Sequence, residues 1–195
     1  MPPTASGKFV LLIGPSGVGK SVILKKLRER HPEWHFPRSA TTRERRAGEG
    51  DELYQFVSDE EFDRLIEENQ VLEWAVVHGG ARYGTLISEI IPAIESGKIV
   101  VREVDVQGFD SIRANHFFRG EAAPYTMQSI FILPEDKEQL IAHITKRSPM
   151  NSEELKRRMA SMERELTYAE LCNRTVTNAE GKLDDAIRAV EGCIA

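Results

Sequence analysis

The sequence predicts an α/β protein in which helices cover both faces of a mostly parallel central sheet. The first apolar run, KFVLLI at 8–13, ends in a glycine-rich turn and leads into a helical pattern at 21–31. Two further apolar runs, at 98–108 and 127–133, have the character of central strands. Helical patterns alternate with these strands along the chain, and this alternation is typical of parallel sheets.

Helix signals are clear at two places in the N-terminal half. Ser58 and Glu61 form a capping box, which predicts a short helix over 58–70. A second helical pattern covers 85–97, and we expect an interruption near Pro92 because proline cannot donate a backbone hydrogen bond.

The other elements are predicted from the spacing of apolar residues. Two helices in the C-terminal half are expected to be separated at Ser148 and Pro149. No internal repeat or low-complexity linker interrupts the pattern, so we predict one domain over 1–195. The remaining elements are strands at 54–57, 71–77 and 174–178 and helices at 135–147, 152–171 and 183–194.

The bulk composition restricts the classes of function. The 195 residues suffice for one α/β domain, and 26 Lys and Arg against 31 Asp and Glu give a net charge of −5. An acidic protein is a poor candidate for binding long nucleic acid, so any anion must meet a local basic pocket. Cys172 and Cys193 fit no metal spacing or disulfide framework. No apolar run reaches membrane-spanning length, and the expected compartment is the cytoplasm, with no membrane partner.

The segment GPSGVGKS at 14–21 matches the phosphate-binding pattern G-x-x-x-x-G-K-[ST] and predicts a three-layer fold of the P-loop NTPase type. Backbone N–H groups of such a loop surround a phosphate, and the helix N-terminus adds a positive field. Lys20 can reach the β- and γ-phosphates, and the Ser21 hydroxyl can join the Mg²⁺ shell, which makes Ser21 the predicted metal ligand. The predicted ATP-binding residues are Gly14, Pro15, Ser16, Gly17, Val18, Gly19, Lys20 and Ser21.

A second anion site is predicted at 39–56. Three arginines, Arg43, Arg45 and Arg46, fall within four positions and stand close to hydroxyl-bearing residues. Guanidinium groups suit a bidentate hold on phosphate. A basic loop run by itself is more often a solvated face, but beside a phosphate loop it indicates a second phosphorylated substrate.

The order of motifs along the chain resembles guanylate kinase. The resemblance is carried by GPSGVGKS, then S-x-TTR-x-x-R-x-GE at 39–49, then LEWAVVHG and YGT within 72–85, then EVDVQG at 103–108. It implies a kinase that transfers the γ-phosphoryl group of ATP to GMP, and also to dGMP, with Mg²⁺ as cofactor. It also implies an inserted GMP-binding region at about 38–92, a helical lid at about 136–165, and a core of 1–37, 93–135 and 166–195.

The resemblance assigns the residues that hold GMP. Glu73 is the most informative of them, because a carboxylate accepts from both donors on the Watson–Crick edge of guanine, whereas adenine presents an acceptor at N1. Ser39 and Thr85 match the hydroxyls that contact the base. Asp105 matches a GMP contact, and Glu103 and Asp105 also stand close to the expected metal shell at a strand end. The full predicted set is Ser39, Arg43, Arg46, Tyr54, Glu73, Tyr83, Thr85, Glu103 and Asp105.

The same resemblance assigns the catalytic residues Lys20, Arg43, Arg147 and Arg158, of which Arg147 and Arg158 belong to the lid. No base for activating water is expected near the strand ends. The GMP phosphate, with a second pKa near 6, is already an ionised nucleophile, so catalysis rests on positioning and on stabilising charge.

The sequence departs from the family pattern at several positions. His143 stands where the family usually has another lid arginine, and it is expected to supply less charge to the phosphates. Arg45 replaces a usual proline. The spacing before Tyr54 is one residue shorter, and that before Tyr83 one residue longer, than is typical. Val22 takes the place of Thr or a similar small residue, and Arg102 interrupts an apolar strand.

Two other functions fit parts of the pattern. A guanylate-kinase-like module that binds phosphorylated peptides would share the fold, but such modules tend to lose the lysine at Lys20 and carry proline in place of Ser39. A P-loop kinase of another small phosphorylated acceptor, such as a ribose bisphosphate, would keep the arginines but would not need Glu73. The sequence leaves open whether the chain acts as a monomer or as a homodimer.

Overall fold

The structure, a computed structural model, describes residues 7–77, 79–147 and 151–194. These residues form two compact units. The first contains residues 7–9, Glu33–Val100 and Asp110–Thr126. The second contains Val10–Pro32, Val101–Phe109 and 127–194.

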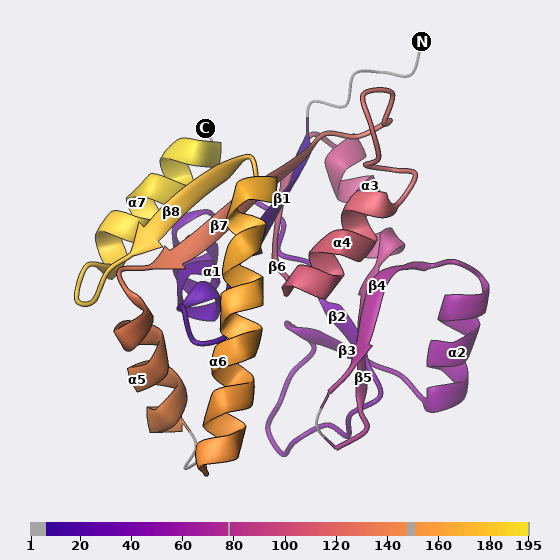
Figure 1. Cartoon of the computed structure of the whole chain (residues 1–195). Coiled ribbons are helices and arrows are strands. Elements are labelled where there is room, and N and C mark those ends of the chain that lie inside the picture. The colour runs from indigo at the N-terminus through magenta and orange to yellow at the C-terminus, as the bar shows by residue number, and fades with distance from the viewer. Residues whose placement is uncertain (1–6, 78, 148–150, 195) are drawn as a thin grey trace. The chain divides into compact units, whose positions relative to one another are not determined.

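The second unit contains most of a four-stranded sheet in the order β6-β1-β7-β8 (Figure 1). The strand β1 carries the apolar run, and its residues Val10 to Ile13 are fully buried. β7 and β8 run parallel, with Ile132 opposite Val176. The predicted α/β fold with a mostly parallel central sheet is therefore confirmed. The strands are β1 (Lys8–Ile13), β6 (Ile99–Glu103), β7 (Met127–Pro134) and β8 (Arg174–Asn178).

Helices of the second unit begin at recognisable signals. α1 starts directly after Gly19, buries Ile23 and Leu27, and contacts α7. In α6 the Asn151 side chain accepts a hydrogen bond from the Glu154 N–H at 2.8 Å, which caps the helix. The helices are α1 (Lys20–Arg30), α5 (Lys137–Arg147), α6 (Ser152–Leu166), η1 (Thr167–Leu171) and α7 (Leu183–Ile194).

The first unit contains a second four-stranded sheet in the order β3-β2-β5-β4. β2 runs parallel to β3 and antiparallel to β5, and β5 runs antiparallel to β4. Ala40, Phe62 and Leu86 form its buried cluster. The strands are β2 (Ser39–Thr41), β3 (Tyr54–Phe56), β4 (Val71–Val76) and β5 (Arg82–Leu86), and the helices are α2 (Asp59–Glu67) and α3 (Ile87–Glu95).

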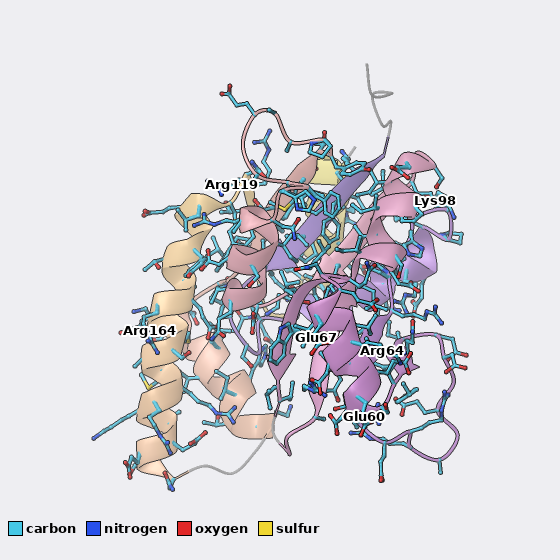
Figure 2. All side chains as sticks on the ribbon, turned by 90° about the vertical axis from the view of Figure 1, so that its right-hand side faces the viewer. Glu60, Arg64, Glu67, Lys98, Arg119 and Arg164 are labelled. Atoms are coloured by element: carbon cyan, nitrogen blue, oxygen red, sulfur yellow. The ribbon has the colours of Figure 1, made fainter. Side chains whose placement is uncertain are left out.

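The N-cap role predicted for Ser58 at the start of α2 is confirmed. The Ser58 hydroxyl accepts a hydrogen bond from the Glu61 N–H at 3.1 Å. On the other side of this helix, the exposed Glu60, Arg64 and Glu67 project from the ribbon (Figure 2). The helix therefore turns Phe62 to the core and charged residues to solvent.

Two predicted boundaries were wrong. The helix predicted from 85 begins at Ile87, and it continues through Pro92 instead of breaking there. Only the hydrogen bond toward Ser88, in the first turn, is lost, and burial of Ile90 and Ile94 offsets that loss.

The strand predicted over 98–108 ends at Glu103, and α4 (Val106–Ala114) follows it. The helix starts because the Asp105 carboxylate accepts a hydrogen bond from the Gly108 N–H at 2.8 Å. α4 begins in the second unit and ends in the first.

Candidate active site

The phosphate loop follows β1 and leads into α1, as the sequence predicted. Gly14 has φ of 150°, and a Cβ there would lie 2.5 Å from the Ile132 carbonyl oxygen. Gly19, the N-cap residue of α1, has φ of 97°, and a Cβ there would lie 2.5 Å from Asn178 Nδ2. Glycine is therefore required at both ends of the loop, by backbone conformation and by the close approach of β7 and of Asn178.

Lys20 and Ser21 occupy the first turn of α1. The Lys20 ammonium folds back onto the loop and donates to the carbonyls of Gly14 and Pro15, the latter at 3.0 Å. The Ser21 hydroxyl lies 2.9 Å and 3.0 Å from the two carboxylate oxygens of Glu103 at the end of β6.

These oxygens suit the metal that the fold implies. Mg²⁺ prefers hard oxygen ligands and is usually held by one or two protein groups together with substrate phosphates. Ser21 and Glu103 provide such oxygens side by side. Among the described residues no group of three or more His, Cys, Asp or Glu forms a metal site of its own. Ser21 and Glu103 therefore fit the Mg²⁺ ion by the chemistry of their oxygens.

The helix α6, which belongs to the predicted lid, contacts the phosphate loop. The Ser16 N–H donates to the Glu165 carboxylate at 3.3 Å, and the Ser161 hydroxyl donates to the same carboxylate at 2.9 Å. Arg158 lies on this face of α6, three residues before Ser161, and its Nε donates to Glu154 at 3.1 Å. The predicted lid residue Arg158 thus shares a helical face with a side chain that reaches the loop.

The remaining lid residues show one unexpected contact. His143 in α5 lies with Nδ1 3.1 Å from the Gly17 carbonyl oxygen and Nε2 3.0 Å from the Glu180 carboxylate. It therefore contacts the backbone of the phosphate loop. The Arg147 side chain and the predicted helix break at 148–150 lie outside the described residues.

In the first unit, the residues predicted to read the base form one row across the sheet. Strand register places Ser39 opposite Tyr54 on one side and opposite Thr85 on the other, and Thr85 opposite Glu73. Side chains of directly opposed residues share a face of the sheet. Four segments that are far apart in the sequence therefore bring Tyr54, Ser39, Thr85 and Glu73 together.

The Glu73 end of this row is fixed by two features. The Thr85 hydroxyl donates a hydrogen bond to the Glu73 carboxylate. The pairing of β4 with β5 shifts register between Val71 and Glu73, an irregularity of the type that often re-aims a side chain next to a site. Glu73 itself is only partly buried, so its carboxylate is accessible to a ligand.

The residues predicted to bind the phosphate of GMP lie one row further along the same face. Tyr83 precedes Thr85 by two residues on β5, and its hydroxyl lies 3.1 Å from Arg43 Nε. The Arg43 guanidinium carbon lies 5.3 Å from the centre of the Tyr54 ring, and the two tyrosine rings are 5.8 Å apart. The structure therefore brings Arg43, Tyr54 and Tyr83 together in spite of the altered spacing before both tyrosines.

Glu49 holds Arg43 in this arrangement. Its carboxylate accepts from Arg43 Nη2 at 2.7 Å and from the Arg46 N–H at 3.1 Å. The Arg43 contact, followed by that N–H, lowers the pKa of Glu49 to about 2, and Glu49 in turn raises the pKa of Arg43. The Arg46 guanidinium has no hydrogen bond or ion pair within the described part of the chain.

The third arginine of the cluster, Arg45, contacts other residues of the same loop and the Phe56 ring. Arg45 pairs with Asp51, donates to the Glu49 carbonyl at 3.0 Å and covers the Phe56 ring at 4.3 Å. At this position, where proline is usual in the family, the loop is thus stabilised by contacts of a side chain.

Sequence reasoning did not identify Glu49 or Glu165 as parts of the two sites. Glu49 was visible as the acidic end of the motif S-x-TTR-x-x-R-x-GE. Glu165 belongs to no sequence motif. Its spacing from Arg158 places both side chains on one face of a helix, but this spacing does not show that the face reaches the phosphate loop.

These features together define a P-loop phosphotransferase with a donor loop in one unit and a separate phosphate-binding group in the other. Comparison with known proteins gives the family. The family model described as Guanylate kinase matches residues 6–195. The chain belongs to the guanylate kinase family.

The alignments with individual relatives cover most of this chain and most of each relative. The guanylate kinase of Nocardia farcinica (strain IFM 10152) is 38% identical over 91% of this chain and 89% of the relative. That of Caldanaerobacter subterraneus subsp. tengcongensis is 40% identical over 95% of this chain and 84% of the relative. The crystal structure of guanylate kinase from Anaplasma phagocytophilum covers 96% of this chain and 84% of its own, with a TM-score of 0.65 and 25% identity.

The predicted family and enzyme class, an ATP:GMP phosphotransferase, are therefore confirmed. The fold is confirmed with them. Within the described residues, no helix is both long and apolar enough to span a membrane.

Proposed function

We propose that the second unit binds ATP with Mg²⁺ through residues 14–21 and that the first unit binds GMP, or dGMP, through its sheet. In this proposal Lys20 follows the γ-phosphoryl group during transfer, and Ser21 and Glu103 hold the metal ion. Mg²⁺, when bound, neutralises charge on the triphosphate. We further propose that the enzyme works in the cytoplasm, where ATP and GMP are available.

The observation that carries the GMP assignment is the row Tyr54, Ser39, Thr85 and Glu73 with Arg43 and Tyr83 beside it. One end of this group is acidic and accepts hydrogen bonds, as the guanine edge requires. The other end carries a guanidinium and two tyrosines, as a phosphate requires. Two residues along a strand span roughly 7 Å, so one nucleotide can contact both ends.

The roles of Asp105, Arg147 and Arg158 rest on the family pattern more than on a contact. Asp105 caps α4, and a GMP contact would use the oxygen that does not bind the Gly108 N–H. Arg147 and Arg158 are proposed to stabilise charge on the transferring group. Glu103 is proposed to hold the metal ion together with Ser21, because its carboxylate lies against that hydroxyl.

The test is a coupled assay of ADP release from ATP and Mg²⁺ with a panel of acceptors. GMP and dGMP are expected to be phosphorylated, whereas AMP, UMP and ribose bisphosphate are expected to give little turnover. Turnover of a sugar phosphate in preference to GMP would overturn the acceptor assignment. Binding of a phosphopeptide without any turnover of GMP would indicate an interaction module instead.

A further inference from the structure

The contact between Glu165 and the phosphate loop is not used by the proposed mechanism. In α6, the Glu165 carboxylate accepts from the Ser16 N–H at 3.3 Å through one oxygen and from the Ser161 hydroxyl at 2.9 Å through the other. All three residues belong to the second unit. A lid-helix side chain thus binds a backbone donor of the loop predicted to bind phosphate.

In this contact, a carboxylate lies where the phosphate loop is expected to bind a phosphate oxygen. Backbone N–H groups in a phosphate loop are arranged to donate to negatively charged oxygen. Without nucleotide such a donor needs water or an internal acceptor. A carboxylate, with two acceptor oxygens and a negative charge, takes the position of a phosphate oxygen on Ser16.

The charge of Glu165 makes this contact incompatible with a bound triphosphate close by. Like charges at short distance repel, and the repulsion is stronger where protein replaces part of the solvent. Lys20, the nearest cation of the loop, is directed to the carbonyls of Gly14 and Pro15. When ATP phosphates enter the loop, they attract Lys20 and compete with Glu165 for the Ser16 N–H.

We propose that Glu165 is an internal competitor of the ATP phosphates, which contacts the phosphate loop through the Ser16 N–H and is displaced when ATP binds. This inference rests on the proposed function of the loop as the ATP site. Ser161 binds Glu165 on this face of α6, and Arg158 lies on the same face, where it is paired with Glu154. Glu165 is a positioning residue. It binds the loop through the Ser16 N–H and thereby lowers the affinity for ATP.

The experiment compares Glu165→Gln with the parent chain. Gln keeps the shape but removes the charge, so the variant is expected to bind ATP and tripolyphosphate about two- to fivefold more tightly, the range that partly exposed charge interactions reach. The affinity for adenosine, which has no phosphate, and the KM for GMP are expected to remain unchanged. Calorimetric titration with tripolyphosphate, ATP and adenosine measures the three affinities.

Two further variants keep the test decisive. Ser161→Ala removes the hydroxyl that orients the carboxylate and is expected to tighten tripolyphosphate binding by a smaller factor. Glu170→Gln, an exposed carboxylate in η1, is the matched control and is expected to change nothing. If Glu165→Gln fails to fold, Ser161→Ala alone tests the proposal.

The proposal is overturned if Glu165→Gln binds tripolyphosphate no more tightly than the parent, or if adenosine affinity changes by the same factor. A weaker affinity of Glu165→Gln for tripolyphosphate would also overturn it, because Glu165 would then support the loop and would not compete with the ATP phosphates. Because tripolyphosphate binding needs no acceptor, this result is independent of GMP turnover. A parent chain that fails to phosphorylate GMP would contradict the proposed function and leave the tripolyphosphate result valid.

Discussion

The two proposed anion sites of this protein are built from different parts of the chain. In the second unit, the donor loop is a continuous segment whose glycines set the backbone, with Gly14 and Gly19 fixed by close neighbours. In the first unit, the proposed acceptor site is assembled from side chains on four strands and from Arg43, which follows β2 and contacts Tyr83 on β5. One site presents mainly backbone donors, and the other presents side chains.

This difference predicts how each site responds to substitution. Backbone donors survive most side-chain changes, so the donor loop depends on its glycines and on the single charge of Lys20. The acceptor site distributes its work over several side chains, so single changes there alter the choice of substrate as well as affinity. The two sites can therefore be distinguished by which kinetic constant each variant changes.

The largest effect is expected from Lys20→Ala. The ammonium stabilises charge on the γ-phosphoryl group during transfer, so kcat is expected to fall by about 10²-fold or more. The KM for GMP should stay within about twofold, because Arg43 and its neighbours belong to the other unit. Steady-state kinetics of both substrates measure this. Lys25→Ala, an exposed lysine on α1, is the control, and near-parental turnover of Lys20→Ala would contradict the donor-loop assignment.

Glu73→Gln is expected to have the next largest effect and to act on the acceptor alone. The amide keeps the shape of the side chain but replaces one acceptor with a donor, which costs about 2–4 kcal/mol of binding to guanine. The kcat/KM for GMP is then expected to fall by about 10- to 10³-fold, while the KM for ATP hardly changes. The penalty on AMP should decrease, because an amide donates to adenine N1.

The ratio of GMP to AMP turnover is therefore the sensitive measurement. It is expected to fall by a larger factor than GMP activity itself. Glu67→Gln is the matched control, because Glu67 is an exposed carboxylate on α2 that does not belong to the row (Figure 2 shows its position on the helix). A Glu73→Gln variant with parental selectivity would show that the guanine edge is read by other residues.

The same contrast explains what the sequence allowed us to predict. The donor loop is a local motif between β1 and α1, so spacing alone located all of its residues. The acceptor residues could be named from the family resemblance, but their row across β3, β2, β5 and β4 depends on strand pairing between distant segments. No local pattern in 39–41 or 82–86 indicated strands, since both are short and polar in part.

The errors at element ends have equally physical causes. The helix α4 was missed because the apolar positions at 104 and 106 continue the strand pattern, whereas the Asp105 cap ends it. The continuity of α3 through Pro92 depends on buried isoleucines whose contacts are tertiary. Glu49 and Glu165 were missed because each acts through a partner that only the fold brings close.

A smaller effect is expected at His143, which contacts the donor loop through a side chain. Both neighbours of its ring, the Gly17 carbonyl and the Glu180 carboxylate, are acceptors, and a neutral imidazole has one N–H for the two. His143→Arg can donate to both and adds a permanent charge, so the KM for ATP is expected to fall about two- to fivefold. His143→Ala is expected to raise it by a similar factor. If the KM for ATP of His143→Arg is no lower than that of the parent, the contact with Gly17 needs the geometry of the imidazole ring.

The smallest expected effect is on thermal stability. Its pH dependence tests the contact between Glu49 and Arg43 in the proposed acceptor site. The folded-state pKa of Glu49 is lowered from 4.5 to about 2, chiefly by the hydrogen bond from Arg43. The folded chain therefore binds fewer protons at Glu49 than the unfolded chain between these values. The stability that Glu49 contributes is complete above about pH 4.5 and is lost as the pH falls toward 2.

Glu49→Gln removes this charge, so the variant should melt about 1–3 °C below the parent at neutral pH, as expected for one partly buried ion pair that still touches solvent. The difference should shrink through the window from 4.5 to 2 and vanish at its acid end. Melting curves by circular dichroism from pH 2 to 7 measure it, with the exposed Glu52→Gln on the same loop as control. A difference that is constant with pH would mean that Glu49 stabilises the loop by its shape, and that Arg43 reaches its position beside Tyr83 without the carboxylate.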